Sequence, residues 1–288
     1  MKIEFNEIMS SKNESLGIPN YGPWYIKSKN NAIEDMFQIE DFIKKVISKN
    51  DIEIFKGYKR FDFINYGSTQ LVFVLHVDDK KYTLLVSQPA TKYGVGKTEF
   101  LNLVRLNELN PDTVIKPISY FSDNPNELYV TPYVYQARCV GVNTTKWGVW
   151  LPDPEYHFED FTKKELSNIC TVMVALLIKY YDDNSNEGLS KIRLDGGDFM
   201  LDKEIDEDGY NIDSILKHIK LIAARDKIHL SLDEYIEALK QELTNNVEKP
   251  RIIGKKLRCP INLEDIEKGI KLGLNLRNRK EKTLTFTK

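Results

Sequence analysis

The sequence predicts an α+β protein, with a small antiparallel β lobe that carries one helix and a larger, mainly helical lobe. Two pairs of strand patterns fall in the first half of the chain, and one helical period separates them. Beyond residue 162 helical periods dominate. Because single cores tend to divide beyond roughly 250 residues, a chain of 288 residues is expected to form two lobes. The expected divisions are 1–50 for an N-terminal arm and helix, 51–137 for the small lobe, and 138–288 for the helical lobe with a basic C-terminal segment.

The composition favours a globular protein of the cell interior. Apolar residues make up 41% of the chain, enough for a packed core, and a formal net charge of -2 provides no one-signed field for coating nucleic acid. The longest apolar run, 172–178, is far short of the roughly 20 residues that span a bilayer. Three separated cysteines without CxxC spacing favour a reducing compartment, so we expect a cytoplasmic location. Abundant Lys, Asn and Ile suggest a low-GC bacterium or its phage, and hence a cytoplasmic or virion-associated protein.

The first elements follow from changes in hydrophobic period. Residues 1–30 have no period and predict an arm, and the apolar spacing over 36–46 predicts a helix. Strand patterns at 71–75 and 82–87, with a tight turn at 78–80 between them, predict an antiparallel hairpin.

A second hairpin follows a single helix. The helical period covers 98–109, where Pro111 ends it. Strands are predicted at 114–121 and 127–134, because the SDNPN between them has turn chemistry.

The second half opens with the strongest helix signal, since Thr162 and Glu165 form a capping-box pattern before an apolar face. Strands at 199–203 and 210–213 are predicted on either side of an acidic turn. Three closing helices are expected at about 214–226, 232–245 and 263–276; Ser231 with Glu234 caps the second and Asn262 the third.

This order of elements resembles the protein kinase superfamily, in particular its aminoglycoside-phosphotransferase-like branch, over roughly residues 60–250. The strings that carry the resemblance are GSTQLVFVL, KKYTLLVS, KTEFLNLVRLNEL, ELYVTPYV and GLSKIRLDGGDFML. They are similar to the glycine-loop strands, the third strand, the small-lobe helix, the strand before the hinge, and the catalytic loop. The resemblance implies a two-lobed kinase-like fold.

The resemblance also implies a site for ATP and Mg²⁺. It places a phosphate-covering turn, a phosphate-binding lysine with its helix glutamate, a hinge for adenine, a catalytic base and two metal-binding carboxylates. The residues of this chain at or near those places are Gly67, Ser68, Lys97, Glu99, Pro132, Tyr133, Asp195, Asp198 and Asp213.

Departures from the family's pattern favour a degenerate protein. Val86 and Ser87 stand where the third strand should carry the lysine, so Lys97 is the substitute candidate. Aligning Asp198 with the metal ligand puts Arg193 at the catalytic base, whereas choosing Asp195 as the base shortens the loop. Losing the lysine and the base together should impair phosphoryl transfer severely. The alternative to a metal site at Asp198 and Asp213 is a surface hairpin with acidic turns, which needs no metal.

Three functions therefore remain open. The favoured interpretation is a pseudokinase-like protein that acts through protein contacts, with weak or no nucleotide binding. The first alternative is an atypical ATP- and Mg²⁺-dependent phosphotransferase, and the second is a structural or virion-associated docking protein.

Two further segments allow competing interpretations. TKYGVGKT at 91–98 ends like a P-loop, but Thr91 replaces the first glycine and the following strands read as antiparallel, which favours a loop whose glycines only permit a bend. Residues 251–288 carry 11 basic and 4 acidic side chains, a charge of +7 against -9 for the rest. This segment is either a solvated helix with a frayed end or a docking element for an acidic surface or nucleic acid.

Overall fold

A computed structural model describes residues 41–43, 45–46, 58–66, 70–87, 91–134, 137–138, 162–190, 198–202, 204–248 and 262–285. They divide into two compact units. The first contains the described residues up to Val104 together with Lys116–Tyr133, and the second contains Arg105–Ile115 and the described residues from Val134 onward. The protein is therefore a mixed α+β molecule with its larger sheet in the first unit.

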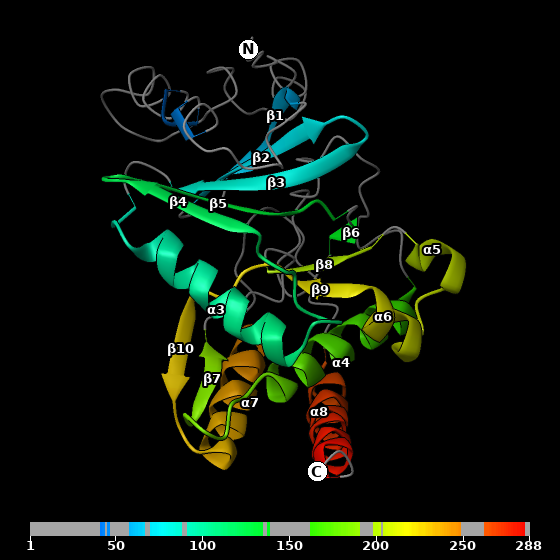
Figure 1. Ribbon diagram of the computed structural model, residues 1–288. Helices are drawn as coiled ribbons and strands as arrows, with labels where there is room; N and C mark the ends of the chain where they lie inside the picture. Colours follow the sequence, from blue (N-terminus) through cyan, green and yellow to red (C-terminus); the bar gives the residue numbers. More distant parts are fainter. Residues whose placement is uncertain are drawn as a thin grey trace. The chain divides into compact units, whose positions relative to one another are not determined.

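The first unit is built on a five-stranded antiparallel sheet with the order β1-β2-β3-β5-β4, drawn from cyan to green in Figure 1. Its strands are β1 (Tyr58–Tyr66), β2 (Gln70–Val77), β3 (Lys80–Ser87), β4 (Ser119–Asp123) and β5 (Asn126–Pro132). The predicted hairpin at 71–87 is confirmed, and β1 is an additional strand that the sequence did not predict. The expected strand at 114–121 begins only at Ser119, because Val114 instead forms a bridge to Leu221.

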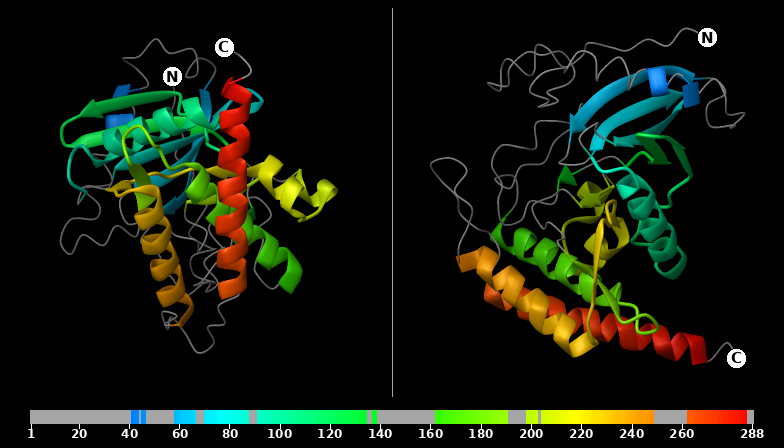
Figure 2. Two further views of the ribbon diagram at one scale, coloured as in Figure 1. Left: turned by 90° about the horizontal axis from the view of Figure 1, so that it is seen from below. Right: turned by 90° about the vertical axis from the view of Figure 1, so that its left-hand side faces the viewer.

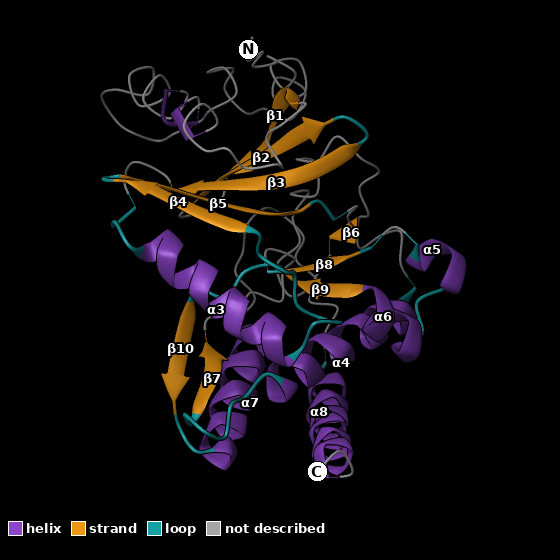
Figure 3. Ribbon diagram, in the orientation of Figure 1, coloured by secondary structure: helices purple, strands orange, loops and turns teal. Residues whose placement is uncertain are grey.

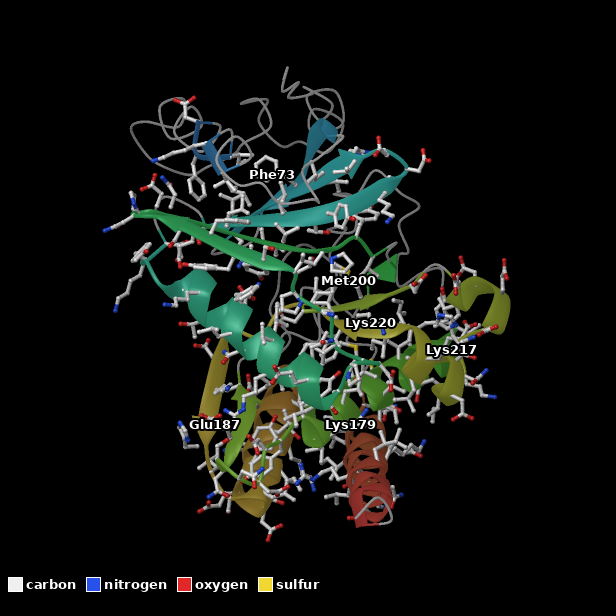
Figure 4. The ribbon with its side chains drawn as sticks, in the orientation of Figure 1. Phe73, Lys179, Glu187, Met200, Lys217 and Lys220 are labelled. Carbon is white, nitrogen blue, oxygen red and sulfur yellow. The ribbon has the colours of Figure 1, made fainter. Side chains whose placement is uncertain are left out.

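Different helical elements pack against the two faces of this sheet. Phe73 and Leu84 lie opposite each other on β2 and β3, on a face that packs against Phe42 and Ile43 of a helical segment. Phe73 is fully buried and is labelled in Figure 4. Alternation along the strands directs Gln70 to the opposite face, where α3 (Val95–Leu109) covers part of the sheet. The predicted helix at 98–109 thus begins three residues earlier.

Helices dominate the second unit. The cap of α4 (Lys163–Lys179) is the predicted capping box: the Thr162 hydroxyl accepts from the Glu165 amide, and the Glu165 carboxylate accepts from the Thr162 amide. The helix is buried from Ile169 to Ile178. Figure 2 shows α8 (Leu263–Thr285) running beside it, and α7 (Leu232–Glu248) packs against α8. Their predicted caps at Ser231 and Asn262 are confirmed.

Two glycines let α8 approach α4 closely. A Cβ atom on Gly269 would lie 2.6 Å from the Val174 Cβ, and one on Gly273 would lie 2.6 Å from the Ile178 Cβ. Arg277, further along α8, donates to the carbonyls of Ile178 and Tyr181 at the end of α4. This arginine of the basic C-terminal segment thus serves the fold.

Short strands and helices complete the second unit (Figure 3). They are β6 (Ala137–Arg138), β7 (Glu187–Ser190), β8 (Phe199–Leu201), α5 (Ile205–Asp208), α6 (Ile212–His218), β9 (Ile219–Leu221) and β10 (Asp226–His229). They form a three-stranded sheet, β6-β8-β9, and a two-stranded sheet, β10-β7.

Two predictions in this region were wrong. The expected strand at 210–213 is instead the start of α6, because the Asn211 side chain accepts from the Ser214 amide and caps a helix. The expected helix at 214–226 ends at His218, because Ile219–Leu221 pairs with β8. Within the described part of the chain, no helix has the length and apolarity to cross a bilayer.

Candidate functional site

The candidate helix glutamate, Glu99, lies in a buried polar network between α3 and the sheet. Its side chain has no exposed surface, and its carboxylate accepts a hydrogen bond of 2.5 Å from the Gln70 amide of β2. The same amide nitrogen lies 3.2 Å from the Tyr129 hydroxyl on β5. One donor to this buried carboxylate is therefore a neutral amide on the second strand, from a residue that the sequence did not single out.

Lys97 is placed away from this network. It is exposed, whereas Glu99 is fully buried. Residues two apart on a helix are about 200° apart around its axis, so the two side chains leave α3 on different sides. The structure does not bring the substitute lysine to the glutamate.

The glycine loop before α3 binds a carboxylate from within the chain. Glu127 of β5 is 1% exposed, and its Oε2 accepts from the amides of Gly94 at 2.8 Å and Gly96 at 3.2 Å. Its Oε1 accepts from the Lys97 amide at 3.0 Å. In a P-loop these amides would donate hydrogen bonds to a phosphate. Here they donate to the carboxylate of Glu127 instead.

Tyr120 of β4 completes the environment of Glu127. Its hydroxyl donates to the Glu127 Oε1 at 2.6 Å. Burial, followed by this hydrogen bond to a carboxylate, raises the pKa of Tyr120 above its usual value, so the phenol keeps its proton at neutral pH. Phe100 packs beside it, with ring centroids 5.6 Å apart. Glu127 thus fastens α3 to both β4 and β5.

The candidate hinge residues lie at the end of β5. Pro132 is exposed and has no amide hydrogen. The Tyr133 amide donates to the Lys81 carbonyl at 3.3 Å, and the Lys81 ammonium lies 5.2 Å from the centre of the Tyr133 ring. A hinge binds adenine through backbone N–H groups. Pro132 has none, and the N–H group of Tyr133 is already hydrogen-bonded to Lys81.

Asp198 lies just before β8 and is 2% exposed. Its carboxylate forms an ion pair with Arg225, with 3.4 Å between Oδ1 and Nη1. The backbone brings them together, since β8 pairs with β9 and the Ile222 amide donates to the Asp198 carbonyl. A guanidinium therefore stands beside the carboxylate that the resemblance assigned to Mg²⁺.

Asp213 is not beside Asp198. It is exposed on the first turn of α6, which enters β9 at Ile219, opposite Leu201. Asp198 lies at the other end of β8, next to Ile222. Among the described residues, no group of three or more His, Cys, Asp or Glu side chains could hold a metal ion. Asp195, Gly67 and Ser68 lie outside the described residues.

A second polar cluster, in the second unit, was not predicted. Arg105 of α3 pairs with Asp182 and donates to the Glu187 carboxylate at 2.8 Å, while Lys227 approaches the same Glu187 oxygen to 3.2 Å. The Ser185 Oγ lies 3.0 Å from an oxygen of each carboxylate, so its one proton is available to either. Glu187 is labelled in Figure 4. The sequence showed only a polar turn here, and nothing in it pointed to the partners that lie 40 and more residues away.

Opposing effects set the acidity of this cluster. Burial alone would raise the pKa of Asp182, but hydrogen bonds from the Asn184 amide and the Ser185 hydroxyl, with the charge of Arg105, lower it below its usual value of 3.8. Burial likewise opposes a net lowering of the pKa of Glu187, for which Lys227 and Ser185 are the main causes. The ionised forms of both carboxylates are thus favoured by hydrogen bonds within their own turn together with cations from other elements.

Comparison with known proteins adds no further constraint on the site: no family model matches the chain, and a search of curated proteins gives no match.

Proposed function

We propose that the chain is a degenerate, kinase-like protein that acts through protein contacts and has weak or no nucleotide binding. The kinase-like part of the proposal is supported by the first unit, where a five-stranded antiparallel sheet carries one helix between its third and fourth strands. The proposed second lobe is the mainly helical unit.

The hydrogen bond between Gln70 and Glu99 carries the proposal. In the family that the sequence resembles, the helix glutamate holds a lysine whose charge binds the nucleotide phosphates. Here the glutamate is fully buried and accepts a hydrogen bond from the neutral amide of Gln70, while the candidate lysine, Lys97, is exposed. A glutamine can orient a carboxylate, but it adds no positive charge for phosphates.

The second unit supports the same conclusion. The resemblance assigned the two metal ligands to Asp198 and Asp213, but Asp213 is exposed on the first turn of α6, at the other end of the β8–β9 hairpin from Asp198. Beside Asp198 lies the Arg225 guanidinium, a cation at the place where the family would hold Mg²⁺. Phosphoryl transfer depends on charge neutralisation by lysine and metal, so this arrangement disfavours it.

Thermal unfolding with nucleotide tests the proposal. A ligand that binds only the folded state raises its stability, and the gain is already about 0.4 kcal/mol when the ligand concentration equals Kd. We expect no change in Tm with ATP and Mg²⁺ at about 5 mM. A saturable rise that requires both ATP and Mg²⁺, and that Glu99→Gln removes, would overturn the proposal in favour of a phosphotransferase. Glu108→Gln, an exposed site on the same helix, is the control.

The protein-contact part needs a separate experiment. The basic segment should be shortened after Arg277, because this residue caps α4. We expect removal of 279–288 to leave Tm unchanged and to weaken retention of the chain on an acidic column, such as immobilised heparin, at low salt. Unchanged retention would rule the last ten residues out as the docking element.

A further inference from the structure

One side of α3 carries a leucine that the core of its own chain does not use. Leu101 is 52% exposed, on a helix whose opposite side is fully buried at Glu99 and Leu103. A single exposed leucine is common on protein surfaces. The residues that share its side of the helix therefore decide whether it belongs to a contact surface.

Four residues form a continuous row on this side, which we call the α3 seam. They are Lys97, Leu101, Val104 and Glu108, separated by four, three and four positions. At about 100° per residue they fall within an arc of about 60° around the helix axis. This is the spacing of the a and d positions along which two helices pack in a coiled coil.

The α3 seam is accessible and is set by one helix. Lys97, Leu101 and Glu108 are exposed, and Val104 is partly exposed. All four lie on the unbroken helix that Figure 1 shows in green, so the helix alone fixes their spacing. The α3 seam thus presents two apolar side chains at its centre, a cation at its first end and an anion at its last.

This order of residues makes the α3 seam complementary to itself. When two copies of α3 pack antiparallel about a two-fold axis, Leu101 of one copy faces Val104 of the other, and Lys97 of one copy faces Glu108 of the other. The symmetry repeats both contacts, so one interface contains two leucine–valine contacts and two lysine–glutamate pairs. A parallel arrangement would instead place like charges opposite each other at both ends.

We propose that the α3 seam is a docking surface for a second copy of this chain, which packs on it antiparallel to form a symmetric dimer. The mirrored order of charged and apolar residues is the observation that selects this occupant. A single helix face buries less than the roughly 1,200 Å² at which stable interfaces begin, so the dimer is weak, with a Kd of about 10 to 100 µM.

Sedimentation velocity of the full chain over about 5 to 500 µM tests the dimer, because mass action shifts the population across this range. We expect the wild type to pass from mostly monomer to mostly dimer. Leu101→Glu should weaken the dimer at least tenfold, since it places a carboxylate against Val104 in both halves of the interface. A wild type that remains monomeric throughout would overturn the proposal, as would an unchanged Leu101→Glu.

Exchange of the two charges tests the antiparallel pairing itself. Lys97→Glu sets two glutamates against each other in both halves, and Glu108→Lys does the same with lysines, so each variant alone should associate at least tenfold more weakly. An equimolar mixture of the two variants should recover the wild-type affinity, because every end contact then joins a lysine to a glutamate. A mixture that stays monomeric would overturn the proposal.

A matched control separates this pairing from net charge. Lys80→Glu reverses the same charge at an exposed position where β3 begins, and it should dimerise like the wild type. A loss as large as that of Lys97→Glu would assign the effect to net charge and overturn the α3 seam. Unfolding at about 5 µM, where the dimer is dissociated, checks that each variant is folded, and Glu108→Gln is a neutral control under that condition. ATP binding by the wild type would contradict the proposed function without changing these outcomes.

Discussion

The carboxylate of Glu127 accepts a hydrogen bond from the Gly96 amide at 3.2 Å. Glu127 can come this close because the glycine has no side chain. A Cβ atom on Gly96 would lie 3.2 Å from the Glu127 Cβ and 2.9 Å from the Ser87 Oγ. The anion that stabilises the first turn of α3 is therefore part of the chain, and the loop is shaped to receive it.

We expect Glu127→Gln to destabilise the protein by about 2 kcal/mol, because charged hydrogen bonds at a buried site contribute more than neutral ones. Urea denaturation measures the change. Glu108→Gln, exposed on the same helix, should stay within about 0.5 kcal/mol of the wild type. Equal effects of the two substitutions would show that the Glu127 carboxylate contributes nothing beyond its volume.

Gly96→Ala should destabilise the protein by about 2 kcal/mol, although alanine is the better helix former, because the added methyl group meets Ser87 and Glu127. In a Ser87→Ala background this cost should fall by about half, because the closest contact has been removed. A double-mutant cycle from four urea curves measures the coupling. Strictly additive effects would contradict the packing described for α3.

Gly273→Ala should destabilise the protein by about 2 to 3 kcal/mol, since α8 would have to move away from α4. Helix propensity alone predicts the opposite, a gain of about 1 kcal/mol. The sign of the change in urea midpoint therefore decides between packing and propensity. Asn275→Ala, exposed on the same helix, controls for propensity and should be neutral or slightly stabilising.

The carboxylates around Arg105 should make stability depend on pH in the acid range. The folded pKa of Asp182 lies below its usual value of 3.8, and that of Glu187 lies below its usual 4.5. Their contribution is complete above about pH 5, where both are ionised in the folded and unfolded chain, and it is lost as the pH falls through the folded values. Unfolding midpoints at a series of pH values measure this loss.

Asp182→Asn should flatten that loss between about pH 5 and pH 3, because one of the two groups no longer takes up a proton on unfolding. Glu237→Gln, exposed on α7, should leave the profile unchanged. A profile as steep in Asp182→Asn as in the wild type would exclude this cluster as the source of the acid sensitivity.

Signals contained within a few residues predicted the structure well. The capping boxes at Thr162 and Ser231 specify helix starts through contacts three residues apart, and both are confirmed. The hairpin of β2 and β3 follows equally from a local turn between apolar strands. A three-residue strand such as β9 is too short to show the alternation of a strand. Its residues instead fit the helical period that precedes them, and the predicted helix therefore ran on to residue 226.

Contacts between distant residues could not be predicted. Glu127 meets the loop at Gly94 from 33 positions away, and Arg225 meets Asp198 from 27 positions away. Nothing in either local pattern selects the partner, because the sheet pairings decide which side chains meet. The resemblance singled out Glu99 and Asp198, and both are buried, but the partners that they meet follow from the packing of distant segments.

The ion pair of Asp198 and Arg225 also constrains how this chain can change by mutation. A neutral residue at 225 would strip a nearly buried carboxylate of its counter-charge, and a neutral residue at 198 would leave a guanidinium with its counter-charge removed. Each single substitution is therefore costly while the other partner remains. The two positions are mutationally coupled, because a single replacement gives a less stable protein whereas a joint replacement avoids that intermediate.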